Sequence, residues 1–188
     1  MTTTSEVFPR EDRIQKSFRH LDVDGNGYIE YDDVIALASR IMSAFGETPA
    51  EPKGRALLDG FETWWQALLA SLDLDGDRRI SPQEYLQGIP EAFADRHRFD
   101  KAFRPVASAV FRMVDTDDDG GITPDEWGRL QRAFRSSEQD AELSFRHLDT
   151  DRNGYLDVDE LVEVARQYYT GTDDSAAANW LWGRVQPS

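Results

Sequence analysis

The sequence predicts an all-α fold: four helix–loop–helix units that form two pairs and pack into one compact globule. The first observation behind this prediction is a repeat, because residues 17–34, SFRHLDVDGNGYIEYDDV, match residues 144–161, SFRHLDTDRNGYLDVDEL, at 11 of 18 positions. Two weaker copies lie between them, at residues 68–85 and 110–127. A recurring unit of this kind is one supersecondary element used several times, and each copy here holds an acidic loop between two stretches of helical pattern.

Apolar residues at fixed positions around all four loops are the second observation. The residues four places before the loops are Phe18, Leu69, Phe111 and Phe145, those immediately before are Leu21, Leu72, Val114 and Leu148, and those directly after are Val34, Tyr85, Trp127 and Leu161. Residues three or four apart share one face of an α-helix, so each loop is predicted to join two helices that each bury one face.

The position of the negative charge is the third observation. The chain of 188 residues has 36 acidic and 21 basic residues, and the four loop windows hold 20 of the acidic residues but only three basic ones. Charge at this density is repulsive unless a cation lies within it. The chain also lacks a basic stripe that would neutralise phosphates, which argues against a nucleic-acid partner.

Composition narrows the remaining possibilities. The chain has no cysteine, which excludes disulfides, zinc–thiolate centres and thiol catalysis. No apolar run approaches the roughly 18–20 residues of a membrane span. Residues 1–13 mix Thr, Ser, Glu, Asp and Arg without an apolar stretch of the signal-peptide type. The sequence therefore favours a cytoplasmic protein without a membrane partner.

The loops fit the EF-hand pattern D-x-[DN]-x-[DN]-G-x5-E, in which twelve residues surround one calcium ion. Calcium prefers six to eight oxygen ligands, which side chains at places 1, 3, 5, 9 and 12 and the backbone carbonyl at place 7 supply. The predicted ligands are Asp22, Asp24, Asn26, Tyr28, Glu30 and Asp33 in loop one; Asp73, Asp75, Asp77, Arg79 and Glu84 in loop two; Asp115, Asp117, Asp119, Gly121 and Glu126 in loop three; and Asp149, Asp151, Asn153, Tyr155, Asp157 and Glu160 in loop four.

Two departures from the pattern predict an order of calcium affinity among the loops. Loop one closes with Asp33, which is one methylene shorter than the usual Glu, and loop two has Arg78 at the sixth place, where glycine normally allows a left-handed turn. Loops three and four are therefore expected to bind calcium most reliably, loop one next and loop two most weakly. We expect three or four calcium ions, with magnesium possible at sites one and two.

The eighth place of each loop predicts how the loops pair. It carries an aliphatic residue in all four copies: Ile29, Ile80, Ile122 and Leu156. EF-hand loops pair through a short antiparallel bridge at this residue, so loop one is expected to pair with loop two, and loop three with loop four. The corresponding domains are residues 1–95, with hands one and two, and residues 96–188, with hands three and four and a C-terminal tail.

The chain resembles the sarcoplasmic calcium-binding protein group of four-EF-hand proteins, especially its bacterial calerythrin-like members. Besides the loops, the resemblance rests on a long insertion at residues 46–62, a short joint near residues 95–98, and a tail containing Asp173, Asp174 and the run Asn179-Trp180-Leu181-Trp182-Gly183. It covers nearly the whole chain. It implies one globule in which two EF-hand pairs face each other across an apolar interior, and a calcium buffer as the usual function.

The expected function is therefore an intracellular calcium buffer or a calcium-dependent folding switch, monomeric and without enzymatic activity. A tail that folds back, with Trp180 and Trp182 between the two halves, would leave no groove for a target helix. A protein target is possible but not indicated. The main alternative is a calmodulin-type sensor that regulates a protein partner, although such sensors use Met-rich grooves and this chain has three Met.

A remote alternative is a photoprotein-like protein that binds an apolar ligand. The aromatic residues that could line its cavity are Trp64, Trp65, Trp127, Tyr168, Tyr169, Trp180 and Trp182. The photoproteins, however, carry a histidine eight residues before the first loop and another five residues after the last. This chain has Ile14 and Ala165 there, so the groups that would handle proton and peroxide chemistry are missing.

Overall fold

The protein folds into eight α-helices within the residues that the structure, a computed structural model, describes, which are 10–134 and 136–171. The helices are α1 (Arg10–Leu21), α2 (Tyr31–Phe45), α3 (Pro52–Leu72), α4 (Pro82–Ala92), α5 (Arg96–Val114), α6 (Pro124–Ala133), α7 (Glu138–Leu148) and α8 (Val158–Thr170). Each predicted loop lies between two of them. The all-α prediction is confirmed.

The helix after each loop begins where the loop residues cap it. The ninth-place side chains of three loops accept a hydrogen bond from the backbone N–H three residues later, over 3.3 Å at Ser81, 3.4 Å at Thr123 and 2.8 Å at Asp157. Pro82 and Pro124 then occupy the first helical position, where the missing N–H costs nothing. The loop sequence therefore also specifies the start of the following helix.

Two antiparallel bridges pair the loops, as the eighth-place residues predict. Ile29 and Ile80 exchange backbone hydrogen bonds of 2.9 and 3.0 Å, and Ile122 and Leu156 exchange bonds of 2.8 and 2.9 Å. All four side chains are fully buried. Loops one and two therefore form one pair, and loops three and four form the other.

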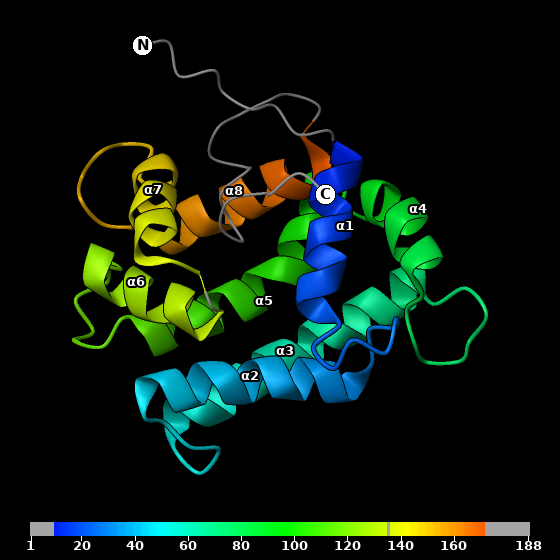
Figure 1. Cartoon of the computed structure of the whole chain (residues 1–188), viewed down its shortest axis with the longest axis horizontal. Helices are drawn as coiled ribbons and strands as arrows, with labels where there is room; N and C mark the ends of the chain where they lie inside the picture. The colour runs from blue at the N-terminus through cyan, green and yellow to red at the C-terminus, as the bar shows by residue number, and fades with distance from the viewer. Residues whose placement is uncertain (1–9, 135, 172–188) are drawn as a thin grey trace.

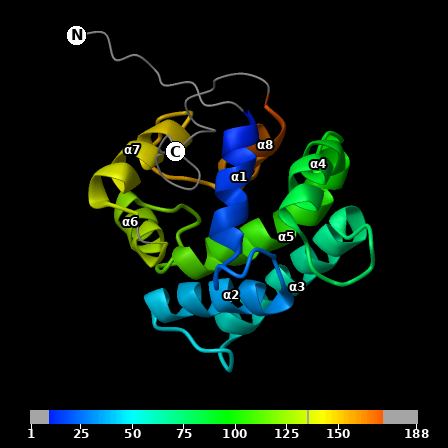
Figure 2. The ribbon, with the colours of Figure 1, turned by 45° about the vertical axis from the view of Figure 1, so that its right-hand side comes forward.

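The two pairs share one hydrophobic core. α3 from the first pair packs along α5 from the second, which is the most extensive helix contact in the described chain. α2 and α3 lie side by side along one edge, while α6 and α7 gather at one end and α4 at the other, with α1 and α5 crossing between them (Figure 1 and Figure 2). One connected cluster of buried apolar residues includes members of all eight helices. The division into residues 1–95 and 96–188 stays a prediction.

The insertion expected at residues 46–62 is mainly helix. α2 ends at Phe45 and α3 begins at Pro52, so only six residues form the connection. The joint near residues 95–98 is likewise short, because Asp95 already caps the N-terminus of α5. Because α3 is long, its N-terminal half reaches both α5 and loop three, which belong to the other pair.

A buried serine joins the two hands of each pair. Ser17 and Ser144 occupy the same position of the repeat, and both are fully buried. The Ser17 hydroxyl lies 3.1 Å from the Tyr85 hydroxyl, and the Trp127 indole N–H donates to Ser144 over 2.7 Å. Each serine also donates to the carbonyl three residues earlier. These polar contacts fix α1 against α4 and α6 against α7.

No helix in the described part of the chain is both long and apolar enough to cross a membrane. The tail, with Trp180 and Trp182, lies outside the described residues.

Candidate metal centres

Three carboxylates gather in each loop, from its first, third and twelfth places. Their ligand oxygens lie within 4.8 Å of one another. The four groups are Asp22, Asp24 and Asp33; Asp73, Asp75 and Glu84; Asp115, Asp117 and Glu126; and Asp149, Asp151 and Glu160. Three negative groups this close repel one another strongly, so the arrangement suits a hard divalent cation with oxygen ligands.

The first-place carboxylate is held by the backbone of its own loop. The sixth-place N–H donates to it in all four loops: Gly27 to Asp22 over 3.0 Å, Arg78 to Asp73 over 3.1 Å, Gly120 to Asp115 over 3.0 Å and Gly154 to Asp149 over 3.1 Å. The other Asp22 oxygen, Oδ1, is buried and has no hydrogen-bond partner. An unsatisfied buried carboxylate oxygen is costly, and a bound cation would satisfy it.

The twelfth-place carboxylate folds back over the loop. Glu126 accepts from the backbone N–H groups of Thr116 and Thr123, over 2.7 and 2.9 Å. Asp33 makes the equivalent contacts with the N–H groups of Val23 and Glu30, both 2.8 Å, despite its shorter side chain. The structure therefore places Asp33 where the other loops have Glu.

Burial and hydrogen bonding act in opposite directions on these carboxylates. Burial raises the pKa of Asp33 above its usual value, although N–H donors from Glu30 and Val23 oppose the shift. Burial also acts to raise the pKa of Glu126, but hydrogen bonds from Thr123 and Thr116 outweigh it, so that this pKa is lowered. Asp33 is therefore the more costly of the two to ionise without a cation.

The predicted ligands at the fifth and ninth places stay outside the three-carboxylate groups. The fifth-place side chains of Asn26, Asp77, Asp119 and Asn153 accept the seventh-place N–H of their own loops over 2.8–2.9 Å. At the ninth place, Glu30 accepts from the Asn26 amide over 3.0 Å and Asp157 caps α8. These side chains are therefore hydrogen-bonded within their own loops.

The seventh-place residues of paired loops meet side by side. The guanidinium carbon of Arg79 lies 4.4 Å from the centre of the Tyr28 ring in the first pair. In the second pair a Cβ at Gly121 would lie only 2.9 Å from Cδ1 of Tyr155, so the tyrosine ring covers the glycine. The sequence predicts only backbone carbonyl ligands at this place and gives no direct signal of the side-chain contacts.

Left-handed backbone occurs at two places in each loop, and the EF-hand pattern predicts only one of them. Arg78 has φ 63° at the sixth place, as expected, but Asp118 and Arg152 have φ 57° and 60° at the fourth. Gly25 and Gly76 occupy the fourth place in the other two loops, which is the sequence signal that was available. Loops two, three and four each hold one non-glycine residue in this region, so strain does not single out loop two.

Basic side chains also contact acidic residues of the loops. Arg79 pairs with Asp77 over 2.9 Å in loop two. Lys53, in the first turn of α3, pairs with Asp118 over 2.8 Å and donates to the Asp115 carbonyl over 2.8 Å. Lys53 therefore joins the first helix pair to loop three of the second. Because this contact spans 62 residues of sequence, the motif alone could not reveal it.

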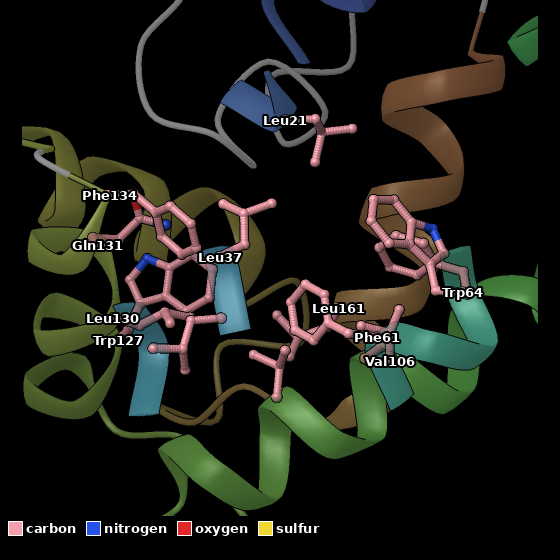
Figure 3. A pocket seen from close by; sticks show the side chains of 14 residues that line it. Leu21, Leu37, Phe61, Trp64, Val106, Trp127, Leu130, Gln131, Phe134 and Leu161 are labelled. Carbon is pink, nitrogen blue, oxygen red and sulfur yellow. The ribbon is translucent and has the colours of Figure 1, made fainter. Parts of the chain in front are cut away.

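An apolar cavity of about 110 Å³ lies between the two pairs. Trp127 and Leu130 project from α6 on one side, and Phe134 directly follows this helix. Trp64 stands opposite on α3, and Phe61, Val106 and Leu161 lie between them (Figure 3). Trp64 and Trp127 were among the predicted lining residues. Trp65, Tyr168 and Tyr169 are buried in the core but do not line this cavity.

Comparison with known proteins gives similarity over most of the chain. A family model described as an EF-hand domain pair matches residues 11–90 and 105–166. Calerythrin of Saccharopolyspora erythraea is 27% identical over 132 residues, which cover 69% of this chain and 75% of calerythrin. The beta chain of a sarcoplasmic calcium-binding protein from Penaeus sp. is 26% identical over 139 residues, which cover 70% of each.

Comparison with solved structures also finds similarity over most of the chain. A Streptomyces coelicolor calcium-binding protein, whose structure is described in terms of prokaryotic calcium-mediated regulation by that protein, superimposes with a TM-score of 0.78 at 33% identity, covering 87% of this chain and 99% of that one. The photoprotein clytin superimposes with a TM-score of 0.74 at 28% identity, covering 99% and 98%. The matches therefore include both calcium-binding proteins and a photoprotein.

Proposed function

The chain belongs to the EF-hand domain pair family, as a calcium-binding protein related to calerythrin and the sarcoplasmic calcium-binding proteins, and we propose that it buffers calcium or folds in response to it. The observation that carries this proposal is the shared core. The helices of the two pairs bury their apolar faces against each other, through α3 and α5 above all, so that calcium would stabilise a closed molecule.

Within each loop we assign the ligands by place. The carboxylates at places 1, 3 and 12 would hold the ion, and the fifth-place oxygen and seventh-place carbonyl would complete the shell. The seventh-place residues are Tyr28, Arg79, Gly121 and Tyr155. Glu30 and Asp157 at the ninth place would act directly or through water. Magnesium is a candidate for sites one and two, because the shorter Asp33 suits a smaller shell and Asp77 is already paired with Arg79.

The small volume of the cavity favours a closed molecule rather than a protein that carries a ligand. Small-molecule sites usually have about 300–1,000 Å³, and this cavity has about 110 Å³. Ile14 and Ala165, at the positions where photoproteins have histidines, are 2% and 0% exposed. We therefore place the photoprotein-like function last, and we propose that the protein has no enzymatic activity.

A calmodulin-type sensor is the second candidate, and the relative from Streptomyces coelicolor favours it. That protein is described as taking part in calcium-mediated regulation, and the similarity covers 99% of its chain. A sensor would expose an apolar surface to a protein target when calcium binds. We propose the buffer first because the apolar faces of both pairs are already buried against each other. The proposal includes a monomer in the cytoplasm without nucleic-acid partners.

Calcium titration by calorimetry, with and without magnesium, tests the proposal. We expect three or four ions to bind, with magnesium weakening the apparent calcium affinity at sites one and two but not at sites three and four. A chain that releases no heat with calcium and keeps the same melting temperature in chelator would contradict calcium buffering. A hydrophobic dye added to the same titration then separates the closed molecule from the sensor.

A further inference from the structure

The side chain of one arginine of loop two, Arg79, lies between the two loops of the first pair. The Arg79 side chain donates from Nε and Nη2 to Oδ2 of Asp77, over 3.1 and 2.9 Å, while its backbone N–H donates to Oδ1 over 2.8 Å. Both oxygens of Asp77 are therefore engaged by a single residue. Asp77 is also the fifth-place ligand assigned to loop two, so calcium and the guanidinium would need the same carboxylate.

The same guanidinium reaches into loop one. It lies 4.4 Å from the centre of the Tyr28 ring, and Nε is 3.9 Å from Oε1 of Glu30. Tyr28 and Glu30 are the seventh- and ninth-place residues of loop one. A planar cation can stack on a ring and pair with a carboxylate at once, which lysine does less well. Arg79 thus touches calcium-binding residues of both loops.

The second pair has no such cation at the equivalent position. Gly121 stands there, and the Tyr155 ring packs directly against it. Because Tyr28 and Tyr155 are matching residues of the repeat, the two pairs differ here in a single side chain facing a tyrosine. The difference between the pairs can therefore be tested at one residue.

We propose that the Arg79 side chain is a built-in counter-cation that weakens calcium binding at loop two and opposes the joint filling of loops one and two. This inference rests on the proposed calcium function and concerns its regulation. Calcium in loop two would take Asp77 from the guanidinium, leaving Glu30 as its carboxylate partner. Calcium in loop one would engage Glu30 and leave the guanidinium on Asp77. An ion bound in either loop therefore favours the ion pair of Arg79 with the carboxylate of the other loop, where the guanidinium competes with the second ion.

The full-length chain carries its own site-specific reporters. The amide N–H groups of Gly27, Arg78, Gly120 and Gly154 each donate to the first carboxylate of their own loop, so their NMR resonances follow the four loops separately. We would titrate calcium into the wild type, Arg79→Ala and Arg79→Lys. Arg55→Ala is the matched control, because it removes the same charge from an exposed position on α3.

Arg79→Ala should tighten binding at loop two about three- to tenfold, the range expected for removing a surface ion pair and a cation–π contact. It should also make loops one and two fill together. Arg79→Lys should give a smaller change, while Arg55→Ala and loops three and four should not change.

Unchanged binding at loop two in Arg79→Ala, with loops three and four titrating normally, would overturn the proposal. An equal gain in Arg55→Ala would also overturn it, because a general charge effect would then suffice. If Arg79→Ala does not fold, Arg79→Lys decides in the same way. Failure of all four reporters to respond in the wild type would instead contradict the calcium function itself.

Discussion

At the residue scale, each loop is shaped by contacts between its own side chains and its own backbone. The twelfth-place carboxylate accepts from two backbone N–H groups, and the first-place carboxylate accepts from the sixth. The loop therefore holds its acidic oxygens close together in spite of their repulsion. Removing one such oxygen should weaken both the loop and its affinity for calcium.

Glu126→Gln tests this contribution in loop three. The variant keeps the shape of the side chain but loses the charge and one strong oxygen ligand, so calcium affinity at this loop should fall by roughly tenfold or more. Asp125→Asn is the matched control, because Asp125 is exposed and adjacent. Calorimetry should show the loss in Glu126→Gln alone, and equal losses in both variants would count against Glu126 as a ligand.

The left-handed arginines give a second prediction at this scale. Arg78→Gly and Arg152→Gly should each raise the free energy of unfolding of the calcium-loaded protein by about 0.5–1 kcal/mol. Glycine removes a steric cost of roughly 1–2 kcal/mol but adds entropy to the unfolded chain. Denaturant unfolding in calcium measures both. Stabilisation by Arg78→Gly alone would mean that only the sixth place is strained.

At the element scale, the two pairs are joined by helices and by contacts far apart in sequence. α3 packs along α5, and Lys53 at the start of α3 donates to the Asp115 carbonyl and pairs with Asp118 in loop three. The Arg129 side chain of α6 donates to the Ala44 carbonyl of α2 over 2.7 Å. A structural change in one pair can therefore affect the other pair through these contacts.

Lys53→Ala tests this connection. The loss of one hydrogen bond and one partly exposed ion pair should lower the free energy of unfolding by about 1 kcal/mol. Lys101→Ala, which removes an exposed lysine from α5, is the control and should have little effect. Chemical denaturation in calcium gives both values. Equal losses in the two variants would show that Lys53 contributes only its charge.

The pH dependence of stability offers a test at α8. Hydrogen bonds from Arg166 lower the pKa of Glu163 to about 2, with Gln167 and Arg96 of α5 adding to the effect. A depressed pKa of this kind stabilises the fold above the unfolded-state value of about 4.3. That contribution is lost as the pH falls towards 2. The partial exposure of Glu163 keeps it below about 1 kcal/mol.

Glu163→Gln should therefore be less stable than the wild type at pH 7, and the difference should shrink as the pH falls from about 4.3 towards 2. Unfolding curves of the two proteins across this range provide the comparison. Taking the difference removes the titration of the loop carboxylates, which both proteins share. A difference that stays constant with pH would contradict the assigned ion pairs.

The sequence predicted most of this architecture because the loop pattern is local. Places 1 to 12 fix the turn, the cap of the next helix and the pairing residue within one short segment, so the loops, the bridges and the positions of Asp33 and Arg78 follow directly. The extent of α3, the contact of Lys53 and the position of the Arg79 side chain depend on which segments meet in space. A repeat pattern carries no such information.

At the scale of the whole molecule, charge repulsion and core burial oppose each other. The four loop windows carry a net charge of −17 by composition, whereas one apolar core joins all eight helices. Calcium would lower the repulsion by two charges for each ion. The free energy of unfolding is therefore expected to depend strongly on bound calcium, in spite of the extensive apolar core.

Removal of calcium tests this balance. Each filled site adds about 4 kcal/mol to the free energy of unfolding when free calcium exceeds its Kd by a thousandfold. A calcium chelator should consequently lower the melting temperature steeply, as followed by calorimetry or circular dichroism. Salt should recover part of the loss in chelator, since it screens the loop charges. An identical melt with and without chelator would contradict the expected dependence.

The most direct test of the closed molecule is the binding of a hydrophobic dye to the full-length protein during a calcium titration. Without calcium, loop repulsion should loosen the helices and expose the core, so the dye should bind. Added calcium should release it as the two pairs close over α3 and α5. A decrease in dye fluorescence that parallels calcium uptake is the predicted result, and an increase would show that calcium opens an apolar surface, as in a sensor.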